Sequence, residues 1–522
     1  MKKTLVLFLT AVLLASSLAG CSAPQQGSST KSTQSAAGGG NSSAAEPTAD
    51  DHTQDTDPSS WPTVSFPVVP TVEVTDEAMV EKALNDYLVS INAGVQADMV
   101  IIDFGNLSTV MTLMLSSNEE PIDLFTYMFW SNLSGVVTND QVIPLDDYLT
   151  QYPEIVQLVG EDNMKLGRVN GTQYAIPVVG SYATAWYYVL RRDIAEEIGV
   201  ADKDGQKITL DELTDILTDA KAAHQDLIYL PITEDFISVN GYDNLGDADI
   251  MGALKNNGVD NSQVVDFYDS DDFEALCRRT KEYAAAGFLL NDPLNQSHDK
   301  SYLKTGVAGG SMTNGYDFAS VKDDMTTSYN FDPVIFQLSE LASTCGSASG
   351  SGYCISSVSQ HPDAAMKMLS LMYTDENVMR FIAQGVEGTH YVVDENGCSW
   401  FPEGKSATEL GWGTGAQWYF PNQTLTIPFG TTNVNVYKDM LASNDKATRS
   451  KAIGFVFDNA PVYDYYVAVD AVIQQYRPAL LYGQVNVDEY LKEFRAELKD
   501  AGMDKVIEEK QKQLNAFLAE NQ

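Results

Sequence analysis

The sequence of 522 residues is poor in positive charge, in cysteine and in histidine. It holds 32 Lys and Arg residues against 72 Asp and Glu residues, which gives a formal net charge of −40. A surface this acidic repels phosphate backbones, so no nucleic-acid partner is expected. It also disfavours adsorption to anionic lipid through protein charge alone. The hydrophobic content of 44% is nevertheless typical of a folded chain, and the length predicts two or three domains.

Metal-ligand and enzyme motifs are also missing from the sequence. The five cysteines include no C-x-x-C pair and the five histidines lie far apart, so neither a metal nor another cofactor is expected. The chain has no P-loop, no G-x-G-x-x-G after a strand and no G-x-S-x-G nucleophile elbow, so we expect no catalytic residue and no enzyme activity. Beyond the N-terminal cysteine, the sequence leaves open whether four others form disulfides or stay buried thiols: Cys277, Cys345, Cys354 and Cys398.

The one long apolar run lies at the N-terminus and resembles a bacterial export signal. Two lysines precede about fifteen mostly apolar residues, a length too short for a comfortable membrane span but usual for a signal-peptide core. The run ends in Leu-Ala-Gly-Cys21, which resembles a bacterial lipobox; the alternative is an ordinary secretory signal followed by a chance cysteine. We predict a signal peptide at 1–20, lipidation of Cys21, a flexible Ser- and Gly-rich linker at 21–60, and attachment to the extracytoplasmic face of the cell membrane.

From Trp61 onward, strand and helix patterns alternate. Apolar runs at 63–69 and 98–103 predict strands on either side of a helix at 76–91. Thr209 and Glu212 fit a capping box that opens a helix toward residue 224. Alternation of this kind predicts an α/β fold with ligand sites at the carboxyl ends of strands. Further strands are expected at 122–125, 174–179 and 185–190, and further helices at 192–198, 273–286, 362–373, 376–384 and 487–521, the last with a break near Gly502.

Aromatic residues are abundant, with 26 Tyr, 20 Phe and 6 Trp. Several stand beside Asn, Asp, Gly or Ser in loop-like stretches. Flat rings stack on the apolar faces of sugars while neighbouring polar groups bind the hydroxyls, so such stretches are candidates for a sugar site. The alternative for each single ring is a place in the core.

Several motifs then carry a resemblance, and their order along the chain is its strongest feature. They are DLFTYMFW at 123–130, VNGTQYAIP at 169–177 leading to YVLRRD at 188–193, GSMTNGY at 310–316 and HPDAAMKMLSLM at 361–372. These stretches resemble the family 1 extracellular solute-binding proteins of bacterial ABC importers, the group that contains maltose-binding protein. EGTHY at 387–391 and the tail at 498–514 resemble a subgroup that is common in Gram-positive bacteria and carries a C-terminal domain of unknown function.

The resemblance implies an α/β, two-lobed periplasmic-binding-protein-like fold in which hinge segments cross between the lobes. Lobe one is expected at 61–180 plus 335–385, and lobe two at 181–334 plus 386–483. A C-terminal helical segment is expected at 484–522.

The implied function is capture of a sugar, most simply an oligosaccharide, and its delivery to the membrane permease of an ABC importer by a monomeric binding protein. The expected ligand-binding residues are Tyr127, Trp130, Ser181, Tyr182, Tyr242, Tyr316, Asp317, Trp412 and Trp418. A non-sugar solute such as a peptide is one alternative. A second is a membrane-tethered glycoside hydrolase, which needs two carboxylates across a cleft. A third is a surface adhesin, which would enclose no pocket.

Overall fold

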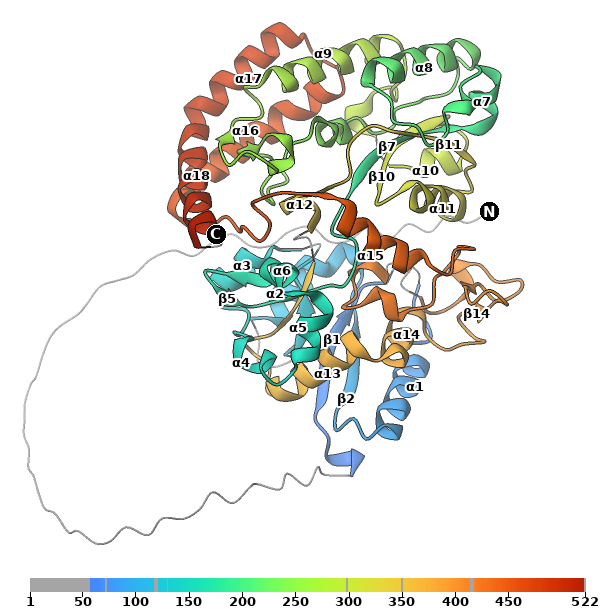
Figure 1. Ribbon diagram of the computed structural model, residues 1–522, viewed down its shortest axis with the longest axis vertical. Helices are drawn as coiled ribbons and strands as arrows, with labels where there is room; N and C mark the ends of the chain where they lie inside the picture. Colours follow the sequence, from blue (N-terminus) through green and yellow to red (C-terminus); the bar gives the residue numbers. More distant parts are fainter. Residues whose placement is uncertain are drawn as a thin grey trace, which may run out of the picture. The chain divides into compact units, whose positions relative to one another are not determined.

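The computed structural model describes residues 57–520, with gaps at 71–72, 117–120, 129, 297–298, 349–350 and 414–416. The predicted signal peptide, Cys21 and most of the predicted linker therefore lie outside the described residues. Within the described ranges, no helix combines the length and the apolar character that crossing a membrane requires. The elements are a mixture of helices and short strands, as an α/β fold requires (Figure 1).

Lobe one consists of the elements that pack around the first hydrophobic core. Its central sheet has the order β3-β13-β6 with antiparallel pairing, and β1 and β2 form a parallel pair in register from Thr63 with Gln96. The strands are β1 (Thr63–Val68), β2 (Gln96–Ile101), β3 (Leu124–Thr126), β4 (Arg168–Val169), β5 (Thr172–Gln173), β6 (Ile176–Pro177) and β13 (Gly352–Ile355). The short antiparallel pair of β14 (Val392–Val393) and β15 (Ser399–Trp400) lies outside this core and is joined to it by Gln384, whose Nε2 donates to Oγ of Ser399 at 3.0 Å. The helices are α1 (Glu77–Ser90), α2 (Leu107–Met114), α3 (Leu133–Thr138), α4 (Asp146–Leu149), α5 (Pro153–Val159), α6 (Glu161–Met164), α13 (Pro362–Thr374) and α14 (Glu376–Gln384).

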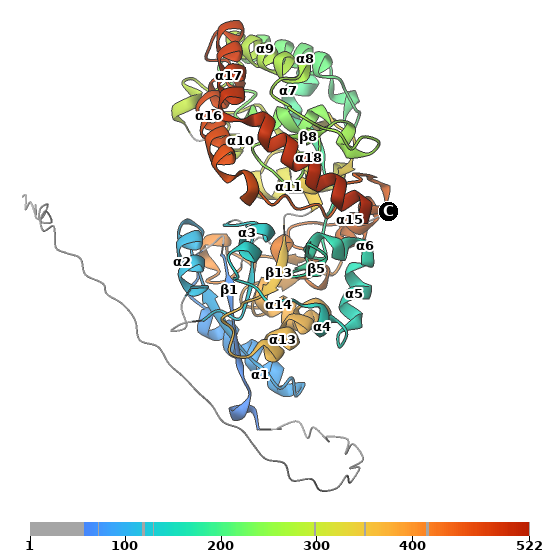
Figure 2. The same cartoon turned by 90° about the vertical axis from the view of Figure 1, so that its left-hand side faces the viewer.

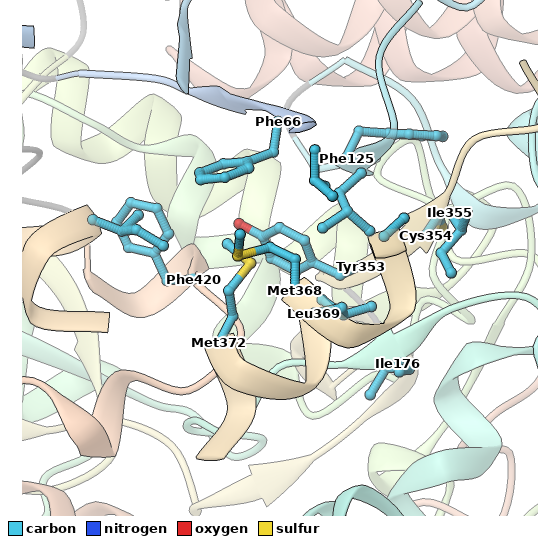
Figure 3. Close-up of a cluster of buried hydrophobic side chains, with 14 of the residues drawn as sticks. Phe66, Phe125, Ile176, Tyr353, Cys354, Ile355, Met368, Leu369, Met372 and Phe420 are labelled. Carbon is cyan, nitrogen blue, oxygen red and sulfur yellow. The ribbon is translucent and has the colours of Figure 1, made fainter. Parts of the chain in front are cut away.

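The core of lobe one draws on chain segments that are far apart in the sequence. Figure 3 shows Phe66 of β1, Tyr353 of β13 and Met368 of α13 beside Phe420. The Tyr419 hydroxyl donates to the carbonyl of Val69 at 3.2 Å, which ties the same late segment to the end of β1. Trp412, Tyr419 and Phe420 thus pack in lobe one, whereas the sequence analysis placed them in lobe two. The reason is their aromatic side chains, which fill the gap beside β1.

Lobe two is built on the antiparallel sheet β10-β7-β11 and a second core. Its strands are β7 (Ala185–Arg191), β8 (Ala253–Leu254), β9 (Val264–Val265), β10 (Gly310–Gly315) and β11 (Pro333–Gln337). Its helices are α7 (Arg192–Glu197), α8 (Leu210–Ala223), α9 (Asp271–Ala285), α10 (Ser301–Lys304), α11 (Phe318–Tyr329), α16 (Tyr463–Leu481), α17 (Val487–Ala501) and α18 (Met503–Glu520).

The C-terminal helices belong to the packing of lobe two. α16 contacts α9, α17 and α18, and both views show these helices side by side (Figures 1 and 2). Leu491 and Phe494 of α17 are buried in the second core. The residues after 483 form the helices that the sequence analysis expected, and their apolar stripe packs on the surface of α9 and α16. β11 likewise lies in lobe two, since it pairs with β7.

Three stretches of chain join the two cores: residues 178–184, the chain between β12 (Ala342–Ser343) and β13, and residues 421–449, which contain α15 (Val436–Lys446) and lead into β16 (Thr448–Arg449). Side chains bind these stretches to one another. Asn444 accepts from the backbone N–H of Tyr182 at 2.8 Å and donates to the carbonyl of Gly180 at 2.9 Å. The first and third of these stretches are therefore hydrogen-bonded to each other.

The four cysteines left open by the sequence are Cys277, Cys345, Cys354 and Cys398, and none of them forms a disulfide within the described residues. All four side chains are buried. The Cys345 thiol donates to the carbonyl oxygen of Ala452, with sulfur and oxygen 2.9 Å apart. These residues act as small apolar side chains of the core.

Candidate functional site

A cavity of about 690 Å³ has walls from both lobes, and we call it the main cavity. Lobe one contributes residues of the loop after β3 and of α3, between Tyr127 and Asn139. Lobe two contributes the loop at 244–248 and the chain that leads into α16, between Phe455 and Tyr466. The volume lies in the range of small-molecule sites.

The main cavity is lined mainly by amides, hydroxyls and aromatic rings. Asp247 is the only charged side chain among the described residues that line it. Its carboxylate is already engaged, because Oδ2 lies 2.8 Å from Nζ of Lys510 and Oδ1 accepts from the backbone N–H of Asp249. The side chains of Asp247 and Lys510 are 7% and 0% exposed. The Asp247–Lys510 pair therefore leaves the wall of the main cavity close to neutral.

Four asparagines supply hydrogen-bond donors to the main cavity: Asn132, Asn139, Asn244 and Asn459. The side-chain oxygen of Asn132 caps α3 by accepting from Gly135 at 2.7 Å, and that of Asn244 accepts from Gly246 at 3.1 Å. Among the described residues, no group accepts a hydrogen bond from the side-chain nitrogen of any of the four. These amide groups are available to a polar solute.

The rings of the main cavity come from Tyr127, Phe455, Phe457, Tyr463 and Tyr466. Tyr463 begins α16 and is 58% exposed, so a large part of its ring is accessible. Tyr127 is 3% exposed, so little of its ring is accessible. Burial raises the pKa of both the Tyr127 and the Tyr466 hydroxyl, so both phenols stay neutral at physiological pH. An accessible ring beside neutral donors is suited to a polar solute that also has apolar faces.

A second cavity of about 260 Å³ adjoins the first, because Asn244 and Gly346 line both. Trp186 of β7 and Tyr242 also line it. The Tyr242 hydroxyl donates to Asp272 at 2.6 Å and its ring packs edge-on against Phe267, so the ring is held in a fixed orientation. Together the two cavities provide a longer site than either does alone.

The structure brings only two of the nine expected ligand-binding residues to these cavities. Tyr127 lines the main cavity and Tyr242 lines the second. Ser181 and Tyr182 lie in the first crossing segment instead, where the Ser181 hydroxyl donates to the carbonyl of Ala183 and that of Tyr182 to the carbonyl of Val178. Their hydrogen bonds hold the hinge.

The other five expected residues lie elsewhere. Trp130 is half-buried, packs against Phe125 and donates from its indole to the carbonyl of Thr126 at 2.9 Å. The Tyr316 hydroxyl donates to the carbonyl of Val436 at 3.4 Å, and Asp317 caps α11 through Ser320. Tyr316 therefore joins the end of β10 to α15, and Asp317 stabilises the start of α11.

Neither Trp412 nor Trp418 lines the main cavity or the second cavity. Trp412 is 0% exposed and donates to the carbonyl of Ile382, so it is a core residue of lobe one that offers no face to a solute. Trp418 is 48% exposed and packs edge-on against Tyr419, away from the residues of either cavity. The neighbouring sequence suggested that both tryptophans lie in loops, but it did not show which residues surround them in space.

The sequence analysis missed Phe457, Tyr463 and Tyr466. A signal was present, because three tyrosines fall within the four residues 463–466 at the start of a helix. Helical periodicity alone did not say which of these rings faces a cavity. Among the described residues, the chain also shows no cluster of His, Cys, Asp and Glu arranged to hold a metal ion.

Comparison with known proteins agrees with this architecture. Residues 72–379 match the bacterial extracellular solute-binding proteins, and residues 451–519 match a domain of unknown function, DUF3502. The chain belongs to the family of bacterial extracellular solute-binding proteins. The family match covers most of lobe one and part of lobe two, which confirms the resemblance drawn from the sequence motifs. The C-terminal match begins just before the segment that lines the main cavity and ends in α18.

Individual proteins are also similar to this chain in sequence or in fold. A carbohydrate ABC transporter substrate-binding protein of Streptococcus pneumoniae serotype 4 is 22% identical over 437 residues, which cover 81% of this chain and 85% of the relative. The solved N-glycan transport solute-binding protein of Streptococcus pneumoniae superposes with a TM-score of 0.76 at 19% identity, over 88% of this chain and all of the other. An HMO-binding, ABC-transporter-associated solute-binding protein from Bifidobacterium longum infantis gives a TM-score of 0.58 at 16% identity, over 88% of this chain and 99% of the other. The fold is thus that of a two-lobed solute-binding protein.

Proposed function

We propose that this solute-binding protein captures a neutral oligosaccharide in the main cavity and the adjoining second cavity, and delivers it to the permease of an ABC importer. The observation that carries the proposal is the chemistry of the main cavity. Its amide donors and accessible ring suit a solute with many hydroxyls, and its one carboxylate is neutralised by Lys510. The relatives named above, which bind or transport carbohydrates, support the same class of solute.

Two features favour an oligosaccharide over a small or charged solute. The two cavities share Asn244 and Gly346, so a chain of several sugar units can extend from one into the other. The net charge of −40 opposes the approach of a polyanion. Binding then works by selection between conformations, with the solute stabilising the one in which both walls contact it.

The proposal includes attachment to the membrane through lipid on Cys21, at the extracytoplasmic face, as a monomer. This part is supported by the lysines, the short apolar run and the Leu-Ala-Gly-Cys21 sequence. The linker that follows lets the folded body reach a permease while it remains tethered.

A glycoside hydrolase is disfavoured by the same geometry. Hydrolysis needs two carboxyl groups on either side of the scissile bond. Among the described lining residues, the main cavity offers Asp247, which is paired with Lys510, and the second cavity offers Glu340, which is paired with Lys207. We therefore infer that the protein releases its solute uncleaved.

Thermal-shift measurements on the full-length protein without its signal peptide test the function. The panel contains the N-glycan fragments Man1GlcNAc and Man5GlcNAc, human milk oligosaccharides, and peptides of similar mass. An oligosaccharide that binds only the native state at 100 times its Kd adds about 2.7 kcal/mol to the free energy of unfolding. Chromatography of the recovered solute separates binding from hydrolysis.

The result that supports the proposal is a shift with an oligosaccharide that is recovered uncleaved and whose Kd barely changes between low and physiological salt. Exposed charges more than about 8 Å apart are screened at physiological salt, so the Kd of a charged solute changes with salt. A neutral solute has no charge to screen, so its Kd stays the same. A shift with peptides alone, or a Kd that rises steeply with salt, would contradict the sugar assignment. Recovery of cleaved products would instead support the glycoside hydrolase as the function.

A further inference from the structure

Helix α18 lies behind the wall of the main cavity. Val506, Lys510 and Leu514 follow one another at intervals of four residues and are buried, so they form one face of the helix. A lysine inside such a buried stripe is unusual, because an ammonium group loses its hydration there. A buried lysine of this kind requires a partner that compensates its charge.

Lys510 has two partners, and both line the main cavity. Its Nζ atom lies 2.8 Å from Oδ2 of Asp247 and 4.9 Å from the centre of the Phe457 ring. Asp247 belongs to the loop of lobe two, whereas Phe457 belongs to the chain before α16. One buried ammonium group thus connects two separate parts of the cavity wall.

Other residues of α18 hold the same two parts. Gln513 donates to the carbonyl of Asp458 at 2.8 Å and accepts from its backbone N–H at 2.9 Å. Leu514 packs in one apolar cluster with Leu245 and Phe455, which line the cavity, and the ring of Phe517 packs edge-on against Phe455. Helix α18 therefore contacts the wall along more than one turn.

The loop that Lys510 holds has a strained backbone. Leu245 and Ile250 both have φ angles of 56°, in the left-handed region that side chains with a Cβ atom rarely adopt. Such residues persist only where surrounding contacts fix them. Arg477 contributes through an ion pair with Asp249 at 3.1 Å, and the Tyr268 hydroxyl donates to the Asp249 carbonyl at 2.7 Å.

We propose that α18, the last helix of the C-terminal domain of unknown function, is a positioning element for the solute site: Lys510 and Gln513 fix the loop 243–250 and the segment 455–460 in the geometry that a solute needs. This inference rests on the proposed function for its solute and on contacts within lobe two for everything else. Lys510 acts through Asp247 and Phe457 and does not itself line the cavity.

Amide hydrogen exchange without any solute tests the positioning role in the full-length protein without its signal peptide. Lys510→Met keeps most of the length of the side chain but leaves the Asp247 carboxylate buried without its cation. Gln513→Ala removes the clamp on Asp458. The double variant Lys510→Met with Asp247→Asn makes the pair neutral and serves as the rescue. Lys512→Met is the matched control, because Lys512 lies on the same helix and is 73% exposed.

We expect amide exchange to accelerate at least tenfold at 243–250 in Lys510→Met and at 455–460 in Gln513→Ala, with exchange in β7 unchanged. The panel oligosaccharide that binds the wild type should bind both variants at least tenfold more weakly. The neutral double variant should regain most of the protection, and Lys512→Met should match the wild type.

Wild-type exchange at 455–460 in folded Gln513→Ala would overturn the inference, even if Lys510→Met failed to fold. So would faster exchange in both variants with unchanged affinity. If no oligosaccharide binds the wild type, the proposed function fails on its own, and the exchange rates still decide the positioning role.

Discussion

Replacing Tyr463 by alanine should weaken solute binding without unfolding the protein. Tyr463 is 58% exposed at the start of α16 and lines the main cavity, so the free protein loses few contacts when the ring is removed. A surface substitution of this kind changes the free energy of unfolding by about 0.5 kcal/mol or less. The bound state loses more, because the solute would cover the accessible ring.

The accessible area sets the magnitude of the loss. A tyrosine buries about 200 Å², so a side chain that is 58% exposed offers about 115 Å² to a solute. A sugar that stacks on one face covers about half of that area, or about 60 Å². At about 25 cal/mol per Å² this is worth about 1.5 kcal/mol, which corresponds to roughly a tenfold rise in Kd.

Tyr465→Ala is the matched control for isothermal titration calorimetry. Tyr465 lies on the same turn of α16 and is 47% exposed, but its ring lies against Gly502 and does not line the main cavity. Its loss should leave Kd within a factor of two of the wild type. Equal losses in both variants, or an unchanged Kd in Tyr463→Ala, would refute the placement of the solute beside Tyr463.

Four further outcomes are expected. Trp412→Ala should cost about 3–5 kcal/mol of stability in denaturant titration, because it removes a fully buried ring, while the folded fraction keeps its Kd. Burial lowers the pKa of His390, whose Nδ1 accepts from the N–H of Val386, so the unfolded chain binds a proton first; the free energy of unfolding should fall as the pH drops below about 6.5, and less so in His390→Gln. Thiol labelling should reach the four buried cysteines only in denaturant, and reductant should leave the melting temperature unchanged. Cys21→Ser should abolish partitioning of the exported protein into detergent, and unchanged partitioning would contradict the lipid anchor.

Local signals in the sequence predicted the helices well. The capping box of Thr209 and Glu212 is present at the start of α8, and Gly385 ends α14 with a φ angle of 81°. Gly502 separates α17 from α18 with a φ angle of 99°, as the predicted break requires. These features depend on residues within one or two turns of each other, so one sequence is enough to find them.

Strands and lobe boundaries depended on distant partners and were predicted less well. The strand expected at 174–179 is reduced to Ile176–Pro177, because the chain turns there into the first crossing segment. Trp412, Tyr419 and Phe420 carry no local sign of which core they join. Their place in lobe one follows from contacts such as that between Tyr419 and Val69, 350 residues apart.

The charge of the sequence favours neutral solutes over polyanions, but it does not predict how the site is lined. Of the 72 acidic residues, Asp247 is the one that reaches the main cavity among the described lining residues, and Lys510 neutralises it. The ion pair joins residues 263 positions apart, so composition and periodicity could not reveal it. A buried pair of this kind adds little stability by itself, but loss of one partner leaves an uncompensated charge. Its position behind the loop therefore makes the neutrality of the site depend on the docking of α18, which places the C-terminal domain within the solute-binding machinery that we propose.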